Sequence, residues 1–251
     1  MLEEADEVLE DWFAGGAEQS TLLRLLAGVG QTSNVVEIGC GLGRLALALR
    51  RVLTDGHYLG IDVVTDKIDF LLREMTPLAP HFRFAHVDVH SAFYNDGGLR
   101  TGSDLQLPCE TGWADAIIAM SVFTHLLPNT LRAYLNEVHR MLRPGGSFLV
   151  SCFLLDKYHP GRPRSQRYSL DQFAFDHDVA GTAGDMCTSD PSCPEAMLAI
   201  RWGYFESLAR SAGLTMVRGP LSGSWSGTAD HWIMGQDLVV FGKPLIQFSA
   251  L

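Results

Sequence analysis

Two patterns of hydrophobic residues alternate along this chain, one typical of strands and one typical of helices. Alternating or continuously apolar runs predict strands near residues 35–38, 58–61, 82–89, 113–120, 147–153, 214–217 and 236–241. Between these runs, apolar residues three and four positions apart predict helices near residues 3–28, 45–52, 65–75, 128–142 and 204–212. In the first helix we expect Gly15 and Gly16 to break the segment into two parts. Strands and helices in this order build a mostly parallel sheet that helices cover on both faces.

Three glycines at alternate positions follow the first strand, in the stretch Gly39-Cys40-Gly41-Leu42-Gly43. Glycine lets the backbone turn tightly and approach a ligand, and the start of the next helix points free N–H groups at that ligand. The stretch therefore predicts a nucleotide-type cofactor site. Dinucleotide oxidoreductases carry a related motif, but their glycine spacing is G-x-G-x-x-G, whereas this chain has G-x-G-x-G.

Two acidic residues accompany the glycines: Glu37 precedes the first one, and Asp62 ends the next strand. The combination resembles the class I S-adenosylmethionine-dependent methyltransferases. The resemblance implies that the glycine loop lies beside the methionine part of the cofactor and that Asp62 holds the ribose hydroxyls. It also implies that Asp88 receives the adenine amine while Val89 packs on the adenine ring. The cofactor-binding residues expected on this basis are Glu37, Gly39, Cys40, Gly41, Gly43, Asp62, Val63, Asp88, Val89 and Ser121.

A later part of the chain carries the same resemblance. The predicted helix 128–142 ends at Arg143-Pro144-Gly145-Gly146 and a strand follows, which is a recognisable signature of this family. The stretch Ser121-Val122-Phe123-Thr124-His125-Leu126 resembles a subgroup of bacterial methyltransferases that modify small molecules and saccharides. The resemblance implies an α/β, Rossmann-like three-layer sandwich. Its seven-stranded, mostly parallel sheet has the order 3-2-1-4-5-7-6, with an antiparallel hairpin at the C-terminus.

Residues 1–251 are expected to form one methyltransferase domain, with residues 1–30 as an N-terminal helical cap that packs on the edge of the sheet. The family resemblance offers the alternative that this helix also covers the cofactor, with residues near Trp12, Phe13 and Gly16 lining the pocket. Residues 156–200 lose the apolar pattern, and an insertion after the fifth strand falls over the pocket of such a fold, so we expect a substrate lid. The side chains that this lid offers are Tyr158, His159, Arg162, Arg164, Arg167, Tyr168, Phe173, Phe175 and His177. His177, Cys187, Asp190 and Cys193 match no compact zinc spacing, so no metal is predicted.

Methyl transfer to a hydroxyl requires the protein to align the acceptor and to remove its proton. His125 is the candidate general base, because it lies just after the fourth strand and imidazole titrates in the useful range. The alternative is that His125 caps the next helix or orients Ser121; His90, His159 and His231 are further candidates for the base.

The expected reaction is metal-independent O-methylation of a small molecule, such as a natural product or a sugar. The Met120-Ser121 junction lacks the Asn-Pro-Pro-Tyr type of motif of enzymes that methylate amines in DNA and protein, and it lacks the carboxylate of metal-dependent catechol methyltransferases. N-methylation of a small amine remains open. So does a methyltransferase-fold protein that binds the cofactor but catalyses another reaction, such as a cyclisation, or that serves as a partner of another enzyme. The roles of Trp225, His231 and Trp232 cannot be read from the sequence.

Composition and charge indicate which class of partner the protein binds. The 251 residues are 47% hydrophobic with a net charge of -10, which argues against nucleic acid and favours a small-molecule substrate. The five cysteines are odd in number and scattered, which does not suggest a disulfide framework. No apolar run approaches the roughly 20 residues that span a bilayer, and the acidic first residues do not resemble a secretory signal, so we expect a cytoplasmic protein without membrane association. A homodimer stays open.

Overall fold

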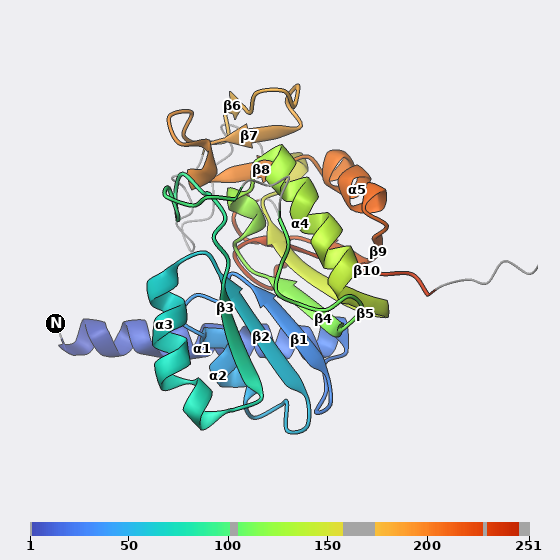
Figure 1. The fold of residues 1–251 in the computed structure, drawn as a ribbon. Coiled ribbons are helices and arrows are strands. Elements are labelled where there is room, and N and C mark those ends of the chain that lie inside the picture. The colour runs from blue at the N-terminus through green and yellow to red at the C-terminus, as the bar shows by residue number, and fades with distance from the viewer. Residues whose placement is uncertain (1, 101–104, 158–173, 228–229, 246–251) are drawn as a thin grey trace, which may run out of the picture.

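The computed structural model describes residues 2–100, 105–157, 174–227 and 230–245. Its centre is a seven-stranded sheet with the order β3-β2-β1-β4-β5-β10-β9 (Figure 1). The first five strands of this row pair in parallel, whereas β10 runs antiparallel to both β5 and β9. Renumbered along the chain, this is the order 3-2-1-4-5-7-6, and the prediction of a Rossmann-like fold with a C-terminal antiparallel hairpin is confirmed.

The elements follow the predicted alternation closely. The strands of the main sheet are β1 (Asn34–Ile38), β2 (His57–Asp62), β3 (Phe82–His86), β4 (Ala114–Ala119), β5 (Leu142–Cys152), β9 (Thr215–Leu221) and β10 (Asp237–Gly242). The helices are α1 (Leu2–Ala27), α2 (Arg44–Leu49), α3 (Thr65–Glu74), α4 (Pro128–Met141) and α5 (Trp202–Ser211). The stretch Arg143–Gly146 is not a separate turn: it lies within β5, where the pairing register with β4 shifts.

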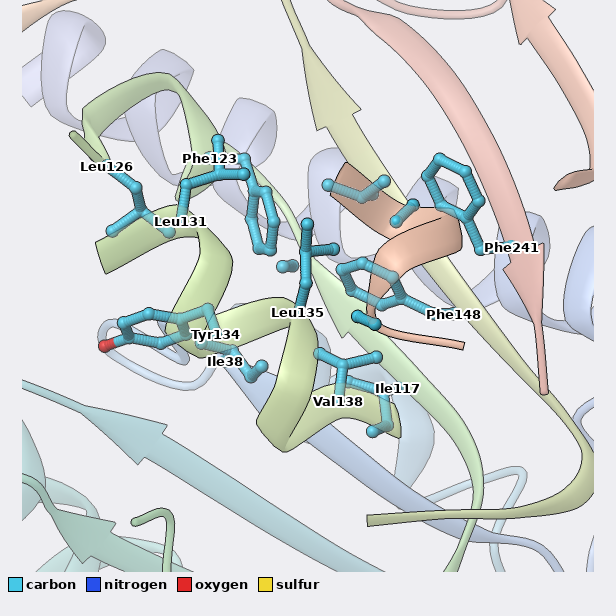
Figure 2. Close-up of a cluster of buried hydrophobic side chains, with 14 of the residues drawn as sticks. Ile38, Ile117, Phe123, Leu126, Leu131, Tyr134, Leu135, Val138, Phe148 and Phe241 are labelled. Atoms are coloured by element: carbon cyan, nitrogen blue, oxygen red, sulfur yellow. The ribbon is translucent and has the colours of Figure 1, made fainter. Parts of the chain in front are cut away.

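Two cores lie on the two faces of the sheet, because successive side chains of a strand point to opposite faces. Ile117 and Phe148 belong to the core under α4 and α5, whereas their neighbours Ile118 and Leu149 belong to the core under α1, α2 and α3. Figure 2 shows the first core, in which α4 packs its apolar face on Ile117 and Phe148. The result is a three-layer arrangement in which both faces of the central strands are buried.

The first helix differs from the prediction, because α1 runs without a break through Gly15 and Gly16. A Cβ atom at Gly16 would lie 2.5 Å from the carbonyl oxygen of Arg44, at the start of α2. The two glycines therefore serve a close approach of α1 to α2 rather than a turn, and tertiary packing outweighs the low helix propensity of glycine.

The insertion after β5 is more ordered than the sequence suggested. Its described part contains a three-stranded antiparallel sheet of β6 (His177–Asp178), β7 (Met186–Thr188) and β8 (Leu198–Ile200). Figure 1 shows this small sheet at one end of the molecule, at the top of the view. Met186 and Ile200 are buried and join the core under α4, so apolar residues too few to form a periodic pattern still anchor the segment.

The loop between β9 and β10 is held by one buried carboxylate. Asp237 is fully buried and accepts hydrogen bonds from the N–H groups of Leu154 (2.9 Å) and Gly223 (2.8 Å) and from the indole N–H of Trp225 (2.7 Å). The Trp225 ring packs on Phe153. Trp225 thus folds the loop, while burial raises the pKa of the Asp237 carboxyl group.

His231 and Trp232 of the same loop are exposed. Among the described residues, no helix has the length and apolarity that crossing a membrane requires. The same part of the chain holds no group of three or more His, Cys, Asp or Glu side chains arranged to bind a metal ion.

Candidate active site

A cavity of about 230 Å³ lies where β1, β2 and β4 end. Six residues of the predicted cofactor set line it: Gly39, Gly41, Asp62, Val63, Val89 and Ser121. His125 lines it as well, together with Glu195 from the insertion. The described residues of its wall include none from α1, so the cavity does not support the alternative in which Trp12, Phe13 and Gly16 line the pocket.

The glycine loop has the backbone geometry that its sequence predicts. Gly39, Gly41 and Gly43 have φ angles of 77°, 54° and 80°, in the left-handed region that residues with a Cβ atom rarely adopt. A Cβ atom on Gly39 would also collide with the Val122 side chain, and one on Gly43 would lie 2.5 Å from Leu71 Cδ2. Glycine is therefore needed at these positions by the fold itself.

Asp62 ties this loop to the end of β2. One carboxylate oxygen accepts a hydrogen bond from the Gly41 N–H at 2.8 Å, and the other accepts one from the Val64 N–H at 3.0 Å. The side chain lines the cavity although Asp62 is only 7% exposed. A carboxylate has about four lone-pair sites, so two remain for hydroxyl groups of a ligand. These free acceptor sites fit the hydroxyl donors of a ribose, and the apolar walls made by Val63 and Val89 fit an adenine ring.

Four predicted cofactor residues do not line the cavity: Glu37, Cys40, Gly43 and Asp88. Glu37 is buried in β1, where it accepts a hydrogen bond from the Tyr58 hydroxyl, and burial raises its pKa to about 8. Cys40 is buried, and burial strongly raises the pKa of its thiol. Asp88 accepts a hydrogen bond from the Asn95 side chain at 3.3 Å. Contact of these four residues with a cofactor stays a prediction.

Ser121 has an unusual conformation for a residue other than glycine, with a φ angle of 56°. Its N–H donates to the Ser151 hydroxyl at 2.8 Å, and that hydroxyl donates to the Gln236 side-chain oxygen at 2.5 Å. This chain of hydrogen bonds holds the backbone in a sparsely populated region directly at the cavity, where such strain is commonly found.

His125 is held in one orientation by groups from two other segments. Its Nδ1 lies 2.8 Å from the backbone carbonyl oxygen of Glu195, and a carbonyl only accepts hydrogen bonds, so Nδ1 carries the proton. Nε2 then presents a lone pair, 3.4 Å from the Tyr94 hydroxyl. Burial lowers the pKa of His125, which keeps the ring neutral at neutral pH. The arrangement suits a general base.

The other histidine candidates are placed less favourably. His90 lines the cavity, but its Nδ1 contacts the Asp96 carbonyl and the residue is exposed. His231 is not among the described residues of the cavity wall. His159 lies outside the described residues, as do the lid candidates Tyr158, Arg162, Arg164, Arg167, Tyr168 and Phe173.

Three residues that were not predicted as site residues also line the cavity: Tyr94, Tyr134 and Glu195. Tyr134 is 4% exposed, and in Figure 2 its hydroxyl points away from Phe123 and Leu135. Its position on the apolar side of α4 made it indistinguishable from a core residue. Glu195 lies in a segment without periodicity, so no local signal marked it.

Comparison with known proteins agrees with this geometry. Residues 36–148 match a family described as a methyltransferase domain. This part of the chain is thus similar to methyltransferase domains. Over 132 residues it is 32% identical to a fatty-acid O-methyltransferase of Mycolicibacterium smegmatis, a match that covers 52% of this chain and 38% of that protein. The match thus spans well under half the length of that relative.

Solved structures repeat the methyltransferase fold at low sequence identity. The [4+2]-cyclase SpnF superposes with a TM-score of 0.59 at 16% identity, over 91% of this chain and 81% of that one. Geranyl diphosphate C-methyltransferase from Streptomyces coelicolor, solved with S-adenosylhomocysteine, gives a TM-score of 0.55 at 14% identity, over 90% and 79% of the two chains. At these identities, the two likenesses show a shared fold and do not show a shared reaction.

Proposed function

We propose that this protein is an S-adenosylmethionine-dependent methyltransferase that methylates a hydroxyl oxygen of a small molecule without a metal ion. The observation that supports the proposal is the neutral His125, which lines the same cavity as the glycine loop and Asp62 and whose Nε2 carries a lone pair. A base next to a cofactor cavity is useful when the acceptor must lose a proton.

Several residues of the chain would hold the cofactor. Asp62 would receive the ribose hydroxyls, Val63 and Val89 would enclose the adenine, and the Gly39–Gly41 backbone would lie along the methionine part. S-adenosylmethionine supplies an activated methyl group when it is bound. The insertion that carries Glu195 would exclude water and align the acceptor as a lid, within one domain spanning residues 1–251.

A second candidate is methylation of a carboxylate, which the relationship to a fatty-acid O-methyltransferase supports. A carboxylate has already lost its proton at neutral pH, so this reaction needs no general base. The fold is also compatible with two further alternatives, N-methylation of a small amine and a non-methylating reaction. One fold can host many reactions, and the cyclase SpnF is an example with a similar fold.

The first experiment is calorimetric titration of the protein with S-adenosylmethionine, S-adenosylhomocysteine and NAD. Binding of the first two alone supports the proposal. Binding of NAD alone would instead identify a dinucleotide enzyme.

The second experiment compares two acceptors with the same apolar chain, dodecanol and dodecanoic acid, by the formation of S-adenosylhomocysteine. The proposal expects His125→Asn to slow turnover of dodecanol about a hundredfold, the scale of general-base catalysis. Cofactor affinity should stay nearly unchanged. His57→Asn, an exposed histidine at the start of β2, is the matched control. If His125→Asn is as fast as the parent with dodecanol, the assigned role of His125 is refuted.

A further inference from the structure

Two segments that are far from His125 in the sequence contact its ring. The ring of Phe93 lies parallel to the imidazole, with centroids 5.8 Å apart and an interplanar angle of 4°. Tyr94 places its ring edge-on to the imidazole at 5.0 Å, with its hydroxyl 3.4 Å from Nε2. Glu195 contributes the carbonyl that receives the Nδ1 proton. The histidine is thus enclosed by the loop after β3 on one side and the insertion on the other.

Glu195 also links these two segments to each other. Glu195 is 8% exposed, and its carboxylate accepts hydrogen bonds from the Ser91 hydroxyl at 2.9 Å and the Ala92 N–H at 2.6 Å. One residue therefore fixes the loop that carries Tyr94 through its side chain and fixes His125 through its backbone. Two hydrogen bonds to one buried side-chain oxygen therefore hold the loop against the insertion.

The geometry determines which group meets the acceptor. The Nε2 lone pair faces the Tyr94 hydroxyl, and Tyr94 itself lines the cavity. A phenol in that place can accept a proton from the cavity side and donate its own to the imidazole. A nucleophile or relay group next to a base, with that base oriented by a third group, is a recurrent catalytic arrangement.

We propose that Tyr94 is a further catalytic residue that relays the acceptor's proton to His125, and that Glu195 is the positioning residue that holds the pair together. The proposal rests on the proposed methylation of a hydroxyl. The acceptor O–H proton goes to the Tyr94 oxygen as the Tyr94 proton goes to His125 Nε2. The acceptor oxygen forms its bond to the methyl carbon with its lone pair, and the electron pair of the broken carbon–sulfur bond stays on sulfur. The imidazolium returns its proton to water after the product leaves.

The acidity of the phenol is consistent with this role. Burial raises the pKa of Tyr94, and the charge of Asp62 raises it further. The hydroxyl therefore keeps its proton at neutral pH and has one to pass on. Lys67 Nζ lies 5.7 Å from the centre of the Tyr94 ring and helps to hold that ring in place.

The first test needs no acceptor. Nitrogen NMR of labelled histidine rings in the full chain, with S-adenosylhomocysteine added, reports which ring nitrogen of His125 carries the proton. The His125→Asn variant identifies the signals. The proposal expects the proton on Nδ1 and a bare Nε2, and a His125 ring protonated on Nε2 overturns it.

The second test examines the link through Glu195. In Glu195→Ala, hydrogen exchange of the Ala92 amide should speed up at least tenfold, because its acceptor is lost. Glu195→Gln keeps an oxygen at that place and should restore slow exchange. Glu206→Ala, at a partly exposed glutamate of α5, is the control. Equal exchange in Glu195→Ala and the parent contradicts the positioning role.

The third test measures turnover of dodecanol. Tyr94→Phe keeps the ring and removes the hydroxyl, and it should lower kcat at least tenfold with little change in KM. Tyr204→Phe in α5 is the matched control. A Tyr94→Phe variant at the parent rate overturns the relay and leaves the proposed function intact. A parent that forms no S-adenosylhomocysteine with either acceptor counts against the proposed function, and the relay is then decided by the NMR result.

Discussion

Replacing Glu37 by glutamine should change how the stability of this protein depends on pH. Glu37 is 4% exposed in β1, and its one described hydrogen bond is donated by the Tyr58 hydroxyl. Desolvation raises its pKa from 4.5 to about 8, although the Tyr58 hydrogen bond and the Arg44 charge act in the opposite direction. The folded state therefore binds this proton more tightly than the unfolded state does.

The sign and size of the effect follow from linkage. The stabilisation is fully present below the unfolded pKa, and it is lost as the pH rises through the folded pKa of about 8. A shift between these two values corresponds to about 5 kcal/mol in total, at roughly 1.4 kcal/mol for each pH unit. Between about pH 6 and about pH 8, the parent should lose about 2 kcal/mol of unfolding free energy from this group alone.

Urea denaturation followed by tryptophan fluorescence across this pH range measures the effect. Glutamine stays neutral and can still accept the Tyr58 hydrogen bond, so Glu37→Gln should show a flatter profile than the parent by about 2 kcal/mol. Glu206→Gln, which affects a partly exposed ion pair with Arg210, should follow the parent. Parallel profiles for the parent and Glu37→Gln would refute the reasoning, because they would mean that Glu37 is ionised in the folded state.

Two further substitutions test the packing of α1 and the glycine loop. Gly16→Ala should destabilise the fold by about 1–3 kcal/mol in urea denaturation, since the new Cβ would lie 2.5 Å from the Arg44 carbonyl, whereas Gly30→Ala, with open space around it, should be nearly neutral. Asp62→Asn should weaken S-adenosylhomocysteine binding by about 1–3 kcal/mol in calorimetry, because one amide group replaces a carboxylate that accepts two backbone hydrogen bonds. Asp66→Asn, at an exposed residue of α3, should bind like the parent, and equal affinities for both variants would contradict the assignment of Asp62.

Much of the fold could be predicted because its signals are local. The strand-loop-helix around Gly39 depends on residues within one short stretch, so its turn and its positive φ angles follow from the sequence alone. Gly15 and Gly16 were misread because the same residue type also permits two helices to approach closely, and the partner atom belongs to Arg44 in another element. Glycine marks a special backbone requirement, and only the tertiary structure decides which one.

The candidate site also contains residues that the local sequence predicts and contacts that it does not. Asp62 could be predicted because it ends a recognisable strand near the glycine loop, but its hydrogen bonds to Gly41 and Val64 could not. Glu195 reaches Ser91 across 104 positions of sequence and touches His125 across 70. No periodicity or spacing rule relates residues at such separations, and their pairing depends on how the insertion packs on the body of the fold.

The choice of acceptor therefore depends on the segments outside the main sheet that contact His125. The glycine loop and Asp62 would serve a methyltransferase for carboxylates, amines or hydroxyls equally well, and the fold is shared with a cyclase. A carboxylate acceptor would gain nothing from a base, because its lone pair is already available. In this chain, however, two segments outside the main sheet converge to desolvate His125, to fix its proton on Nδ1 and to aim Nε2 at a phenol in the cavity. Under the proposed function, this arrangement serves to take a proton from the acceptor, and that role favours a hydroxyl over a carboxylate.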